Sequence, residues 1–189
     1  MILAPYAVFA LITPVVASNG PKVLLPLLSV IIIVYVGCAL HAALVYSGTL
    51  MVFAKFSPMK FFKGIFPAQA IAFTTCSSSA TLPVNMQCTE ENLGVPKSIS
   101  SFVLPLGATI NMDGTALYQG ICALFIANVY GLELTMAQQF TIVLTATLAS
   151  IGTAGVPGAG LIMLTMVLQT VGLPLEGLAL VAGIDRILD

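Results

Sequence analysis

The sequence has very little charge. Charged residues make up 7% of the 189, hydrophobic residues make up 59%, and the mean hydropathy is +1.08. Soluble domains carry about 25% charged residues, so this composition excludes an ordinary soluble domain. It predicts a polytopic membrane protein with about six membrane-inserted segments at roughly 20 residues per span. Most transporters with the pattern described below need more segments, so we expect a fragment.

Basic patches, histidines and paired cysteines are also scarce. The formal net charge is -1, which provides no basic surface for nucleic acid and excludes that class of partner. The four cysteines, at positions 38, 76, 88 and 122, have no CxxC spacing, and His41 is the only histidine. We therefore expect free thiols, no zinc site and no cofactor. His41 lies in an apolar run, which favours packing or a single hydrogen bond over catalysis.

The apolar runs divide the chain into six segments. Met1 to Ser18 lacks the basic residues of a signal peptide, so we interpret it as the end of a helix. A tilted helix, two re-entrant hairpins, an interrupted helix and the start of a last helix are expected to follow. In chain order the ranges are 1–18 for the end of the first helix, 22–54 for the tilted helix, 58–94 for hairpin 1, 98–130 for the interrupted helix, 135–172 for hairpin 2 and 175–189 for the last helix.

Lysines indicate how these segments are oriented. Lys55, Lys60 and Lys63 share one short connection and Lys97 lies in the next, so the positive-inside rule predicts that both are cytoplasmic. The segment between them must then enter and leave on one side. The order hairpin, helix, hairpin, helix, with the hairpins opening to opposite sides, is typical of an inverted-topology repeat.

The interrupted helix contains polar residues at membrane depth. Its centre reads LPLGATINMDGTALY from Leu104 to Tyr118. An ionised Asp113 there costs about 2.5 to 3.5 kcal/mol unless it faces a cavity, an ion or a partner. Unwinding near Gly107 and Gly114 would free backbone carbonyls, and these, with Asn111 and Asp113, form an oxygen-only set suited to sodium. The alternative is a structural Asp113 paired with Arg186.

Each hairpin is interrupted in its middle. Hairpin 1 carries TTCSSSATLP at 74–83, and Pro83 predicts that its second arm begins there. The N-H groups of that arm and the serine hydroxyls would bind a carboxylate; alternatively, the serines only cap a turn. Hairpin 2 carries ASIGTAGVPGAG at 149–160, whose glycines suit a movable gate or, alternatively, a static turn.

The last segment holds Asp185, Arg186 and Asp189. The two acids share a helix face at spacing i, i+4. They could form a neutralised cluster with the arginine or bind an ammonium group.

These motifs resemble the dicarboxylate/amino acid:cation symporter family, which includes glutamate and aspartate transporters. The resemblance rests on four motifs, namely SSSATLP at 77–83, PLGATINMDGTALYQG at 105–120, ASIGTAGVPGAG at 149–160 and GIDRILD at 183–189. It implies an all-α, elevator-type glutamate transporter fold, incomplete here, and a homotrimer in a lipid bilayer.

The resemblance also implies roles for individual residues. The substrate site would comprise Ser77, Ser78, Ser79, Met112, Thr115, Val156, Pro157, Gly158, Ala159, Gly160 and Asp189, with Asp189 binding the amino group. The sodium ligands would be Gly107, Thr109, Asn111, Asp113, Ser150, Ile151 and Thr153.

Three departures from the family pattern qualify these roles. Archaeal members have an arginine where this chain has Cys76, and Arg186 is a candidate substitute. Gln119 stands where proton-coupled mammalian carriers have glutamate, so we expect sodium coupling without proton carriage at that position. Further substrate and sodium residues of the family lie beyond Asp189.

We therefore expect a multi-pass protein of the plasma or inner membrane that takes up aspartate, glutamate or a C4-dicarboxylate with sodium. The fragment alone should be inactive, and a poorly folding truncated product is one alternative. Two others are a proton-coupled dicarboxylate symporter and a sodium-coupled neutral amino acid symporter. A passive channel would lack coupling to sodium. An intramembrane aspartyl protease using Asp113 and Asp185 would need a GxGD motif, and Asp113 lies in NMDG.

Overall fold

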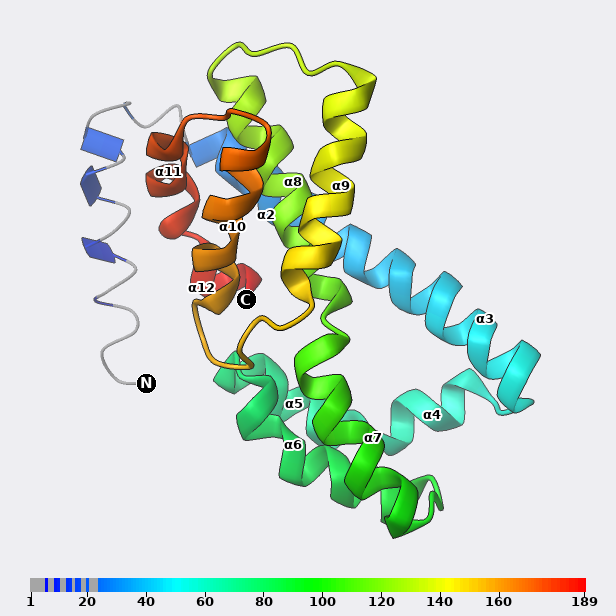
Figure 1. Ribbon diagram of the computed structural model, residues 1–189. Coiled ribbons are helices and arrows are strands. Elements are labelled where there is room, and N and C mark those ends of the chain that lie inside the picture. The colour runs from blue at the N-terminus through cyan, green and yellow to red at the C-terminus, as the bar shows by residue number, and fades with distance from the viewer. Residues whose placement is uncertain (1–5, 7–8, 11–12, 15, 18–19, 21–23) are drawn as a thin grey trace.

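The regular structure of this chain is helical. The computed structural model describes residues 6, 9–10, 13–14, 16–17, 20 and 24–189 (Figure 1). Within these residues every regular element is a helix and no strand occurs, which confirms the all-α class. Most of the predicted helix over 1–18 lies outside the described residues.

The first long element is a continuous helical rod. It comprises α2 (Leu24–His41), the π-helix η2 (Ala42–Tyr46), α3 (Ser47–Thr49) and a second π-helix, η3 (Leu50–Ala54). Residues Leu25–Ala54 include an 18-residue stretch with a mean hydropathy of 2.4, and they form the one helix in the described part of the chain that is long and apolar enough to cross a membrane. Lys55, with φ of 49°, ends the rod in the left-handed conformation.

Hairpin 1 follows the rod. Its elements are α4 (Pro58–Gly64), α5 (Phe66–Thr75), α6 (Ser78–Gln87) and the π-helix η4 (Cys88–Asn92). The prediction that its second arm begins near Pro83 is wrong, because α6 begins at Ser78 and contains Pro83. Ser77 provides the start signal instead: its side chain accepts the Ala80 N-H at 3.1 Å, which satisfies one of the unpaired N-H groups of the first turn.

The interrupted helix consists of α7 (Lys97–Ile110) and α8 (Asp113–Val129). Unwinding was expected near Gly107 and Gly114, but both glycines are helical and the break falls at Asn111 and Met112. The two residues at the break have φ values of -119° and -110°. The break therefore separates two short helices directly before Asp113.

Hairpin 2 and the last segment complete the chain. The arms of hairpin 2 are α9 (Met136–Ser150) and α10 (Ala159–Thr170), and residues 151–158 between them form a non-helical tip. Thr135 and Gln138 start α9 with a reciprocal capping box. The last segment contains η5 (Leu175–Gly177), α11 (Leu178–Ala182) and α12 (Asp185–Leu188).

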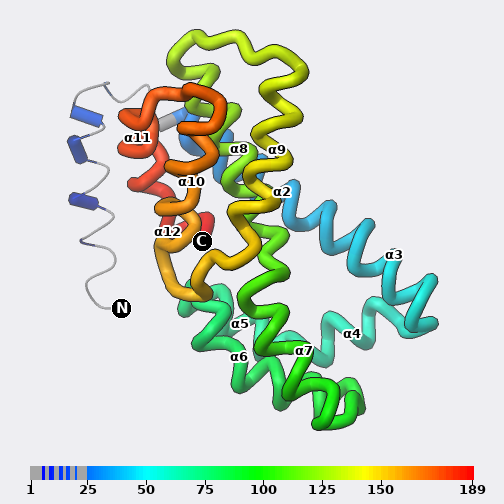
Figure 2. The backbone as a smooth tube through the Cα atoms, viewed as in Figure 1, coloured from blue at the N-terminus to red at the C-terminus, as the bar shows by residue number. Residues whose placement is uncertain are grey.

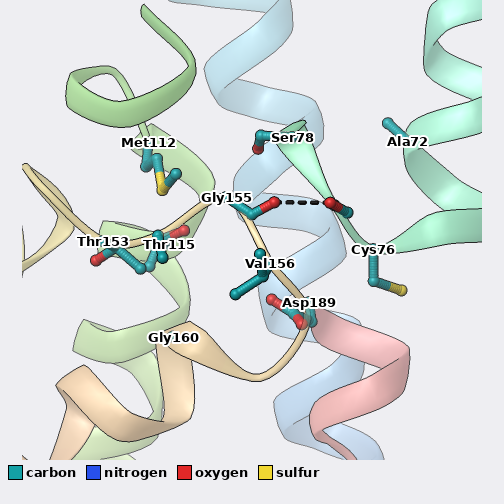
Figure 3. Close-up of a pocket in the computed structure, with 12 residues that line it drawn as sticks. Ala72, Cys76, Ser78, Met112, Thr115, Thr153, Gly155, Val156, Gly160 and Asp189 are labelled. Atoms are coloured by element: carbon teal, nitrogen blue, oxygen red, sulfur yellow. Dashed lines mark hydrogen bonds between the residues drawn. The ribbon is translucent and has the colours of Figure 1, made fainter. Parts of the chain in front are cut away.

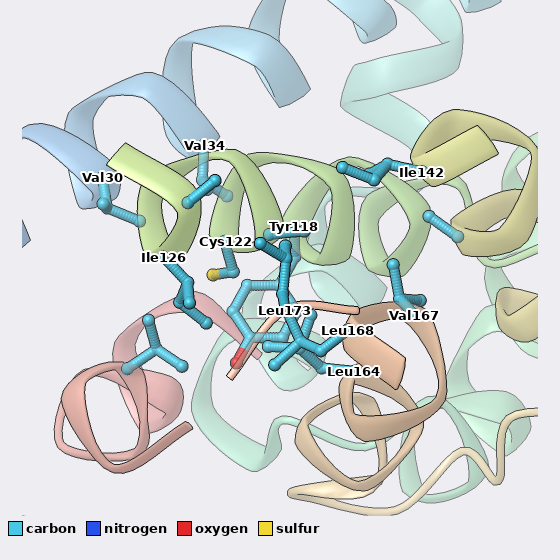
Figure 4. Close-up of a cluster of buried hydrophobic side chains, with 14 of the residues drawn as sticks. Val30, Val34, Tyr118, Cys122, Ile126, Ile142, Leu164, Val167, Leu168 and Leu173 are labelled. Atoms are coloured by element: carbon cyan, nitrogen blue, oxygen red, sulfur yellow. The ribbon is translucent and has the colours of Figure 1, made fainter. Parts of the chain in front are cut away.

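The hydrophobic core surrounds α8. Tyr118, Cys122 and Ile126 of α8 meet side chains from α2, α9 and α10 (Figure 4), including Val30, Val34, Ile142, Leu164, Val167 and Leu168. Hairpin 1 contributes no residue to this cluster. In Figure 2 the helices α5, α6 and α7 group at one end of the fold and α8 to α12 at the other. The two groups meet at the helix break and the hairpin tips.

Candidate functional site

The tips of the two hairpins bind each other directly. The Gly155 carbonyl oxygen accepts a hydrogen bond from the Ser77 hydroxyl at 2.7 Å (dashed line in Figure 3). It also accepts one from the Ser79 N-H at 3.0 Å. A Cβ atom on Gly155 would lie 2.8 Å from the Ser79 hydroxyl and 3.0 Å from its nitrogen, so the backbone approach requires glycine. The N-H groups expected to bind a carboxylate are therefore partly used by the opposite hairpin.

Two further hydrogen bonds hold the tip of hairpin 2. The Gly152 N-H donates to the Thr109 carbonyl at 2.9 Å, and the Gly158 N-H donates to Asp189 Oδ2 at 2.6 Å. Gly152 and Gly158 have φ values of 90° and 81°, a left-handed region that glycine enters without strain. The tip thus bonds to hairpin 1, to α7 and to the last segment.

A cavity of about 160 Å³ lies where the tips meet the helix break. Of the predicted substrate residues, seven line it: Ser77, Ser78, Met112, Thr115, Val156, Gly160 and Asp189. Ser79, Pro157, Gly158 and Ala159 do not. Arg186 lines a neighbouring cavity of about 330 Å³ with Cys38 and Cys76.

Five other residues line the smaller cavity, namely Ala72, Cys76, Thr153, Ala154 and Gly155. Thr153 was predicted as a sodium ligand, and the other four were not predicted as site residues. The signal for Ala154 and Gly155 was present, because both lie inside the interrupted motif of hairpin 2. Cys76 has a φ of 50°, a left-handed conformation that is uncommon for a residue other than glycine. The sequence gives no signal for this conformation at Cys76.

The predicted sodium residues occupy two places. Asn111 and Asp113 line a second polar cavity of about 350 Å³, together with Tyr46, Met112 and Thr115. The backbone oxygens of Gly107, Thr109 and Ser150 each accept one backbone hydrogen bond, from Asn111, Gly152 and Thr153 respectively. A carbonyl oxygen has a second lone pair, so these atoms can still bind a cation.

Ser150 and Thr153 bond within their own segment through their hydroxyls. Ser150 donates to the Thr147 carbonyl at 2.8 Å and Thr153 donates to the Ala149 carbonyl at 2.7 Å. Ile151, between them, is the first residue of the non-helical tip. The hydrogen bond from the Gly152 N-H to the Thr109 carbonyl holds this segment next to the break between α7 and α8.

Asp113 pairs with His41 and not with Arg186. Its Oδ2 atom lies 3.0 Å from His41 Nε2 and accepts the Tyr46 hydroxyl at 3.1 Å. The proposed structural pair with Arg186 is therefore wrong. His41 makes the polar contact that its lone position in an apolar run suggested, whereas no sequence signal pointed to Tyr46.

The two acids of the last segment have separate partners. Asp185 is buried and accepts the Tyr118 hydroxyl at 2.9 Å, while Asp189 is exposed and accepts the Gly158 N-H. Arg186 is exposed and makes no ion pair within the described residues. A neutralised cluster of these three residues is thus absent from the described structure.

Chemically, the smaller cavity offers hydroxyls, backbone groups and one carboxylate. Asp189 is the one charged residue among those that line it. In the described part of the chain no group of three His, Cys, Asp or Glu side chains could hold a metal ion. Carbonyl, hydroxyl and single-carboxylate oxygens suit an alkali cation, and Asp189 suits an ammonium group.

Gln119 is fully buried next to this region. Its Nε2 atom donates to the Gly160 carbonyl at 3.3 Å, and its Oε1 atom has no hydrogen-bond partner among the described residues. Gly160 lies in the first turn of α10, the second arm of hairpin 2, so Gln119 connects the core helix to that arm.

Comparison with known proteins identifies the family. The profile of the sodium:dicarboxylate symporter family matches residues 1–189. The chain belongs to this family. Its members are transporters and not enzymes, and the family name implies sodium coupling and a membrane location.

Individual symporters are also similar to this chain. An excitatory amino acid transporter of Caenorhabditis elegans is 49% identical over 153 residues, covering 81% of this chain and 30% of the relative. Human excitatory amino acid transporter 2 is 47% identical over 156 residues, covering 82% of this chain and 27% of the relative. Human neutral amino acid transporter A is 46% identical over 153 residues, covering 81% of this chain and 29% of the relative. The chain thus matches less than a third of the length of these relatives.

Proposed function

We propose that this chain forms part of the transport domain of a secondary active symporter that takes up an acidic amino acid with sodium. The supporting observation is the cavity between the two hairpin tips and the helix break, bordered by the Ser77 to Gly155 and Gly158 to Asp189 hydrogen bonds. A substrate amino group would bind Asp189, and its carboxylate would bind serine hydroxyls and N-H groups at the start of α6.

In this proposal, hairpin 2 is the gate. Opening would break the four hydrogen bonds of its tip, which join it to hairpin 1, α7 and the last segment. Sodium would bind oxygens around Asn111 and Asp113 and beside Thr109, Ser150, Ile151 and Thr153. A gate that closes only over bound substrate and ions couples their movements.

The proposed membrane arrangement keeps the six predicted segments. The ranges 58–94 and 135–172 would be re-entrant from opposite sides, with Lys55, Lys60, Lys63 and Lys97 cytoplasmic. The many exposed apolar side chains, such as Phe53, Phe73 and Ile162, would face lipid or the rest of a homotrimer. The transport domain would move against a fixed scaffold in an elevator motion.

A neutral amino acid is the second candidate substrate. It is favoured by the cavity lining, in which no basic side chain is present to pair with a side-chain carboxylate of the substrate. Arg186 is near but lines the neighbouring cavity. A serine or alanine substrate needs only the groups for its amino and carboxylate ends.

The test uses the protein expressed from its complete coding sequence and reconstituted in vesicles. An inward sodium gradient should drive accumulation of radiolabelled L-aspartate above the external concentration, and replacing sodium by choline should abolish it. Accumulation of L-serine but not L-aspartate would select the second candidate. Flux that only equilibrates would indicate a channel and contradict symport. Uptake driven by a pH gradient without sodium would contradict the role expected from Gln119.

A further inference from the structure

Asp113 receives both of its side-chain hydrogen bonds on one oxygen. His41 Nε2 and the Tyr46 hydroxyl lie 3.0 and 3.1 Å from Oδ2. Because a carboxylate only accepts hydrogen bonds, the Nε2 atom of His41 acts here as a donor. Within the described residues neither bond involves Oδ1, which leaves that oxygen available to another ligand.

A π turn brings the two donors together. His41 and Tyr46 are five residues apart, which in an α-helix would separate their side chains by about 140° around the axis. The chain between them, Ala42–Tyr46, forms a π-helix, in which one additional residue per turn reduces that separation. The helix therefore departs from α geometry at the place where both side chains must reach Asp113.

The contact is not a by-product of core packing. None of the residues of η2, α3 and η3 is buried, and this half of the rod diverges from the bundle in Figure 1. The rings of His41 and Tyr46 meet edge to face with centroids 4.9 Å apart, so each restricts the orientation of the other. The two side chains thus form a small rigid unit directed at one oxygen atom.

Tyr46 also stands between two cavities. It lines the polar cavity of about 350 Å³ that contains Asp113. It equally lines an apolar cavity of about 650 Å³ between the diverging rod and hairpin 1. Tyr46 thus lines both spaces, and its hydroxyl binds the carboxylate of Asp113.

We propose that His41 and Tyr46 are positioning residues for sodium, holding Oδ2 of Asp113 so that Oδ1 is presented to the ion. The inference rests on the proposed sodium site at Asp113. Side chains that hydrogen-bond a metal ligand fix its orientation, and their loss typically weakens metal binding 10- to 100-fold. Neither residue belongs to the sodium ligands expected from the sequence.

The experiment measures the sodium concentration that half-saturates thermal stabilisation of the protein from its complete coding sequence, with choline chloride balancing the salt. Tyr46→Phe keeps the ring and removes only the hydroxyl, and we expect it to raise that concentration roughly tenfold. His41→Leu should do the same. His41→Gln retains an N-H donor and should restore much of the affinity, a rescue that a purely packing role would not produce.

Tyr35→Phe is the matched control. Tyr35 lies on the same helix, and its hydroxyl donates to the Ile187 carbonyl at 2.8 Å, away from Asp113. Its loss should lower the melting temperature without changing the half-saturating sodium concentration. If one variant unfolds before sodium can be titrated, the sodium titrations of the other variants still test the proposal.

The outcomes separate this inference from the function on which it rests. If Asp113→Asn abolishes sodium stabilisation while Tyr46→Phe and His41→Leu titrate like the parent protein, the positioning role is overturned and the sodium site stands. If Asp113→Asn titrates like the parent, or the parent shows no sodium stabilisation, the proposed sodium site fails and the positioning role fails with it.

Discussion

The tips of the two hairpins differ although both close on the same cavity. At the tip of hairpin 1, between α5 and α6, only Cys76 and Ser77 are non-helical, and Ser77 caps α6 with its own side chain. In hairpin 2 the residues 151–158 are non-helical, and α10 begins at Ala159 after Gly158, whose N-cap position provides no side-chain cap. Hairpin 1 therefore has a tip stabilised from within, whereas the tip of hairpin 2 depends on partners elsewhere.

The arms of the hairpins show the opposite difference. Those of hairpin 2 supply Ile142, Ala146, Leu164 and Val167 to the core, each at most 1% exposed. The α5 and α6 arms of hairpin 1 bury only Ala68 and Thr81. A loosely built tip on firmly anchored arms can move while its base stays in place. This comparison explains why hairpin 2 is the better candidate for a gate.

The largest expected effect tests the anchoring of the arms. Leu164→Ala creates a cavity beside α8 and should destabilise the protein by about 2 to 5 kcal/mol. Phe73→Ala removes a side chain of hairpin 1 that is 73% exposed, so the effect should be small. Denaturation in detergent followed by circular dichroism compares the two. Equal losses would mean that hairpin 1 is anchored as firmly as hairpin 2.

The next effect concerns the contact between the tips. Gly155→Ala places a methyl group against the Ser79 hydroxyl and backbone nitrogen, and overpacking of this kind costs about 1 to 3 kcal/mol. Because the tips must separate, we expect weaker binding of radiolabelled substrate. Gly120→Ala is the control, since nothing lies within 4 Å of its Cβ position and alanine favours the helix. Unchanged binding in Gly155→Ala would show that the cavity does not need this contact.

The smallest effect separates capping from contact between hairpins. Ser77 and Thr135 are both N-cap residues, and replacing either by alanine should cost about 1 kcal/mol of stability. Only Ser77 also donates to the Gly155 carbonyl. Ser77→Ala should therefore weaken substrate binding several-fold, whereas Thr135→Ala should leave it unchanged. A similar loss of binding in both variants would reduce the role of Ser77 to helix stability.

The helical class and the position of the unusual segments could be predicted from the sequence. Long apolar runs with few charges specify helices, and polar residues at the centre of such runs indicate where a helix is interrupted. The residue at which each break falls could not be predicted. Gly107 lies inside α7 and Gly114 lies in the first turn of α8, so at both positions the helix overrides the low helix propensity of glycine.

The contacts of the candidate site were harder to predict than its residue types. The sequence indicated Ser77 to Ser79 as hydrogen-bond donors for a ligand. In the structure, however, the Ser77 hydroxyl and the Ser79 N-H both donate to the Gly155 carbonyl, and Gly155 lies 78 residues after Ser77 in the chain. Tyr46 was missed because a lone tyrosine in an apolar helix carries no motif. Its role depends on the π turn, a backbone feature that residue preferences do not encode.

That π turn also has a consequence for how the chain can vary. A π turn is an α-helix with one residue added, so the number of residues in the turn matters more than their identity. Ala42, Ala43 and Leu44 can be exchanged for other apolar residues without moving Tyr46. Deleting one of them would return the turn to the α repeat and leave the later residues of the rod nearly unrotated, because the π turn accommodates one added residue within an otherwise α-helical register. Related sequences can therefore differ here by a gap of one residue without a change in the orientation of the rest of the rod.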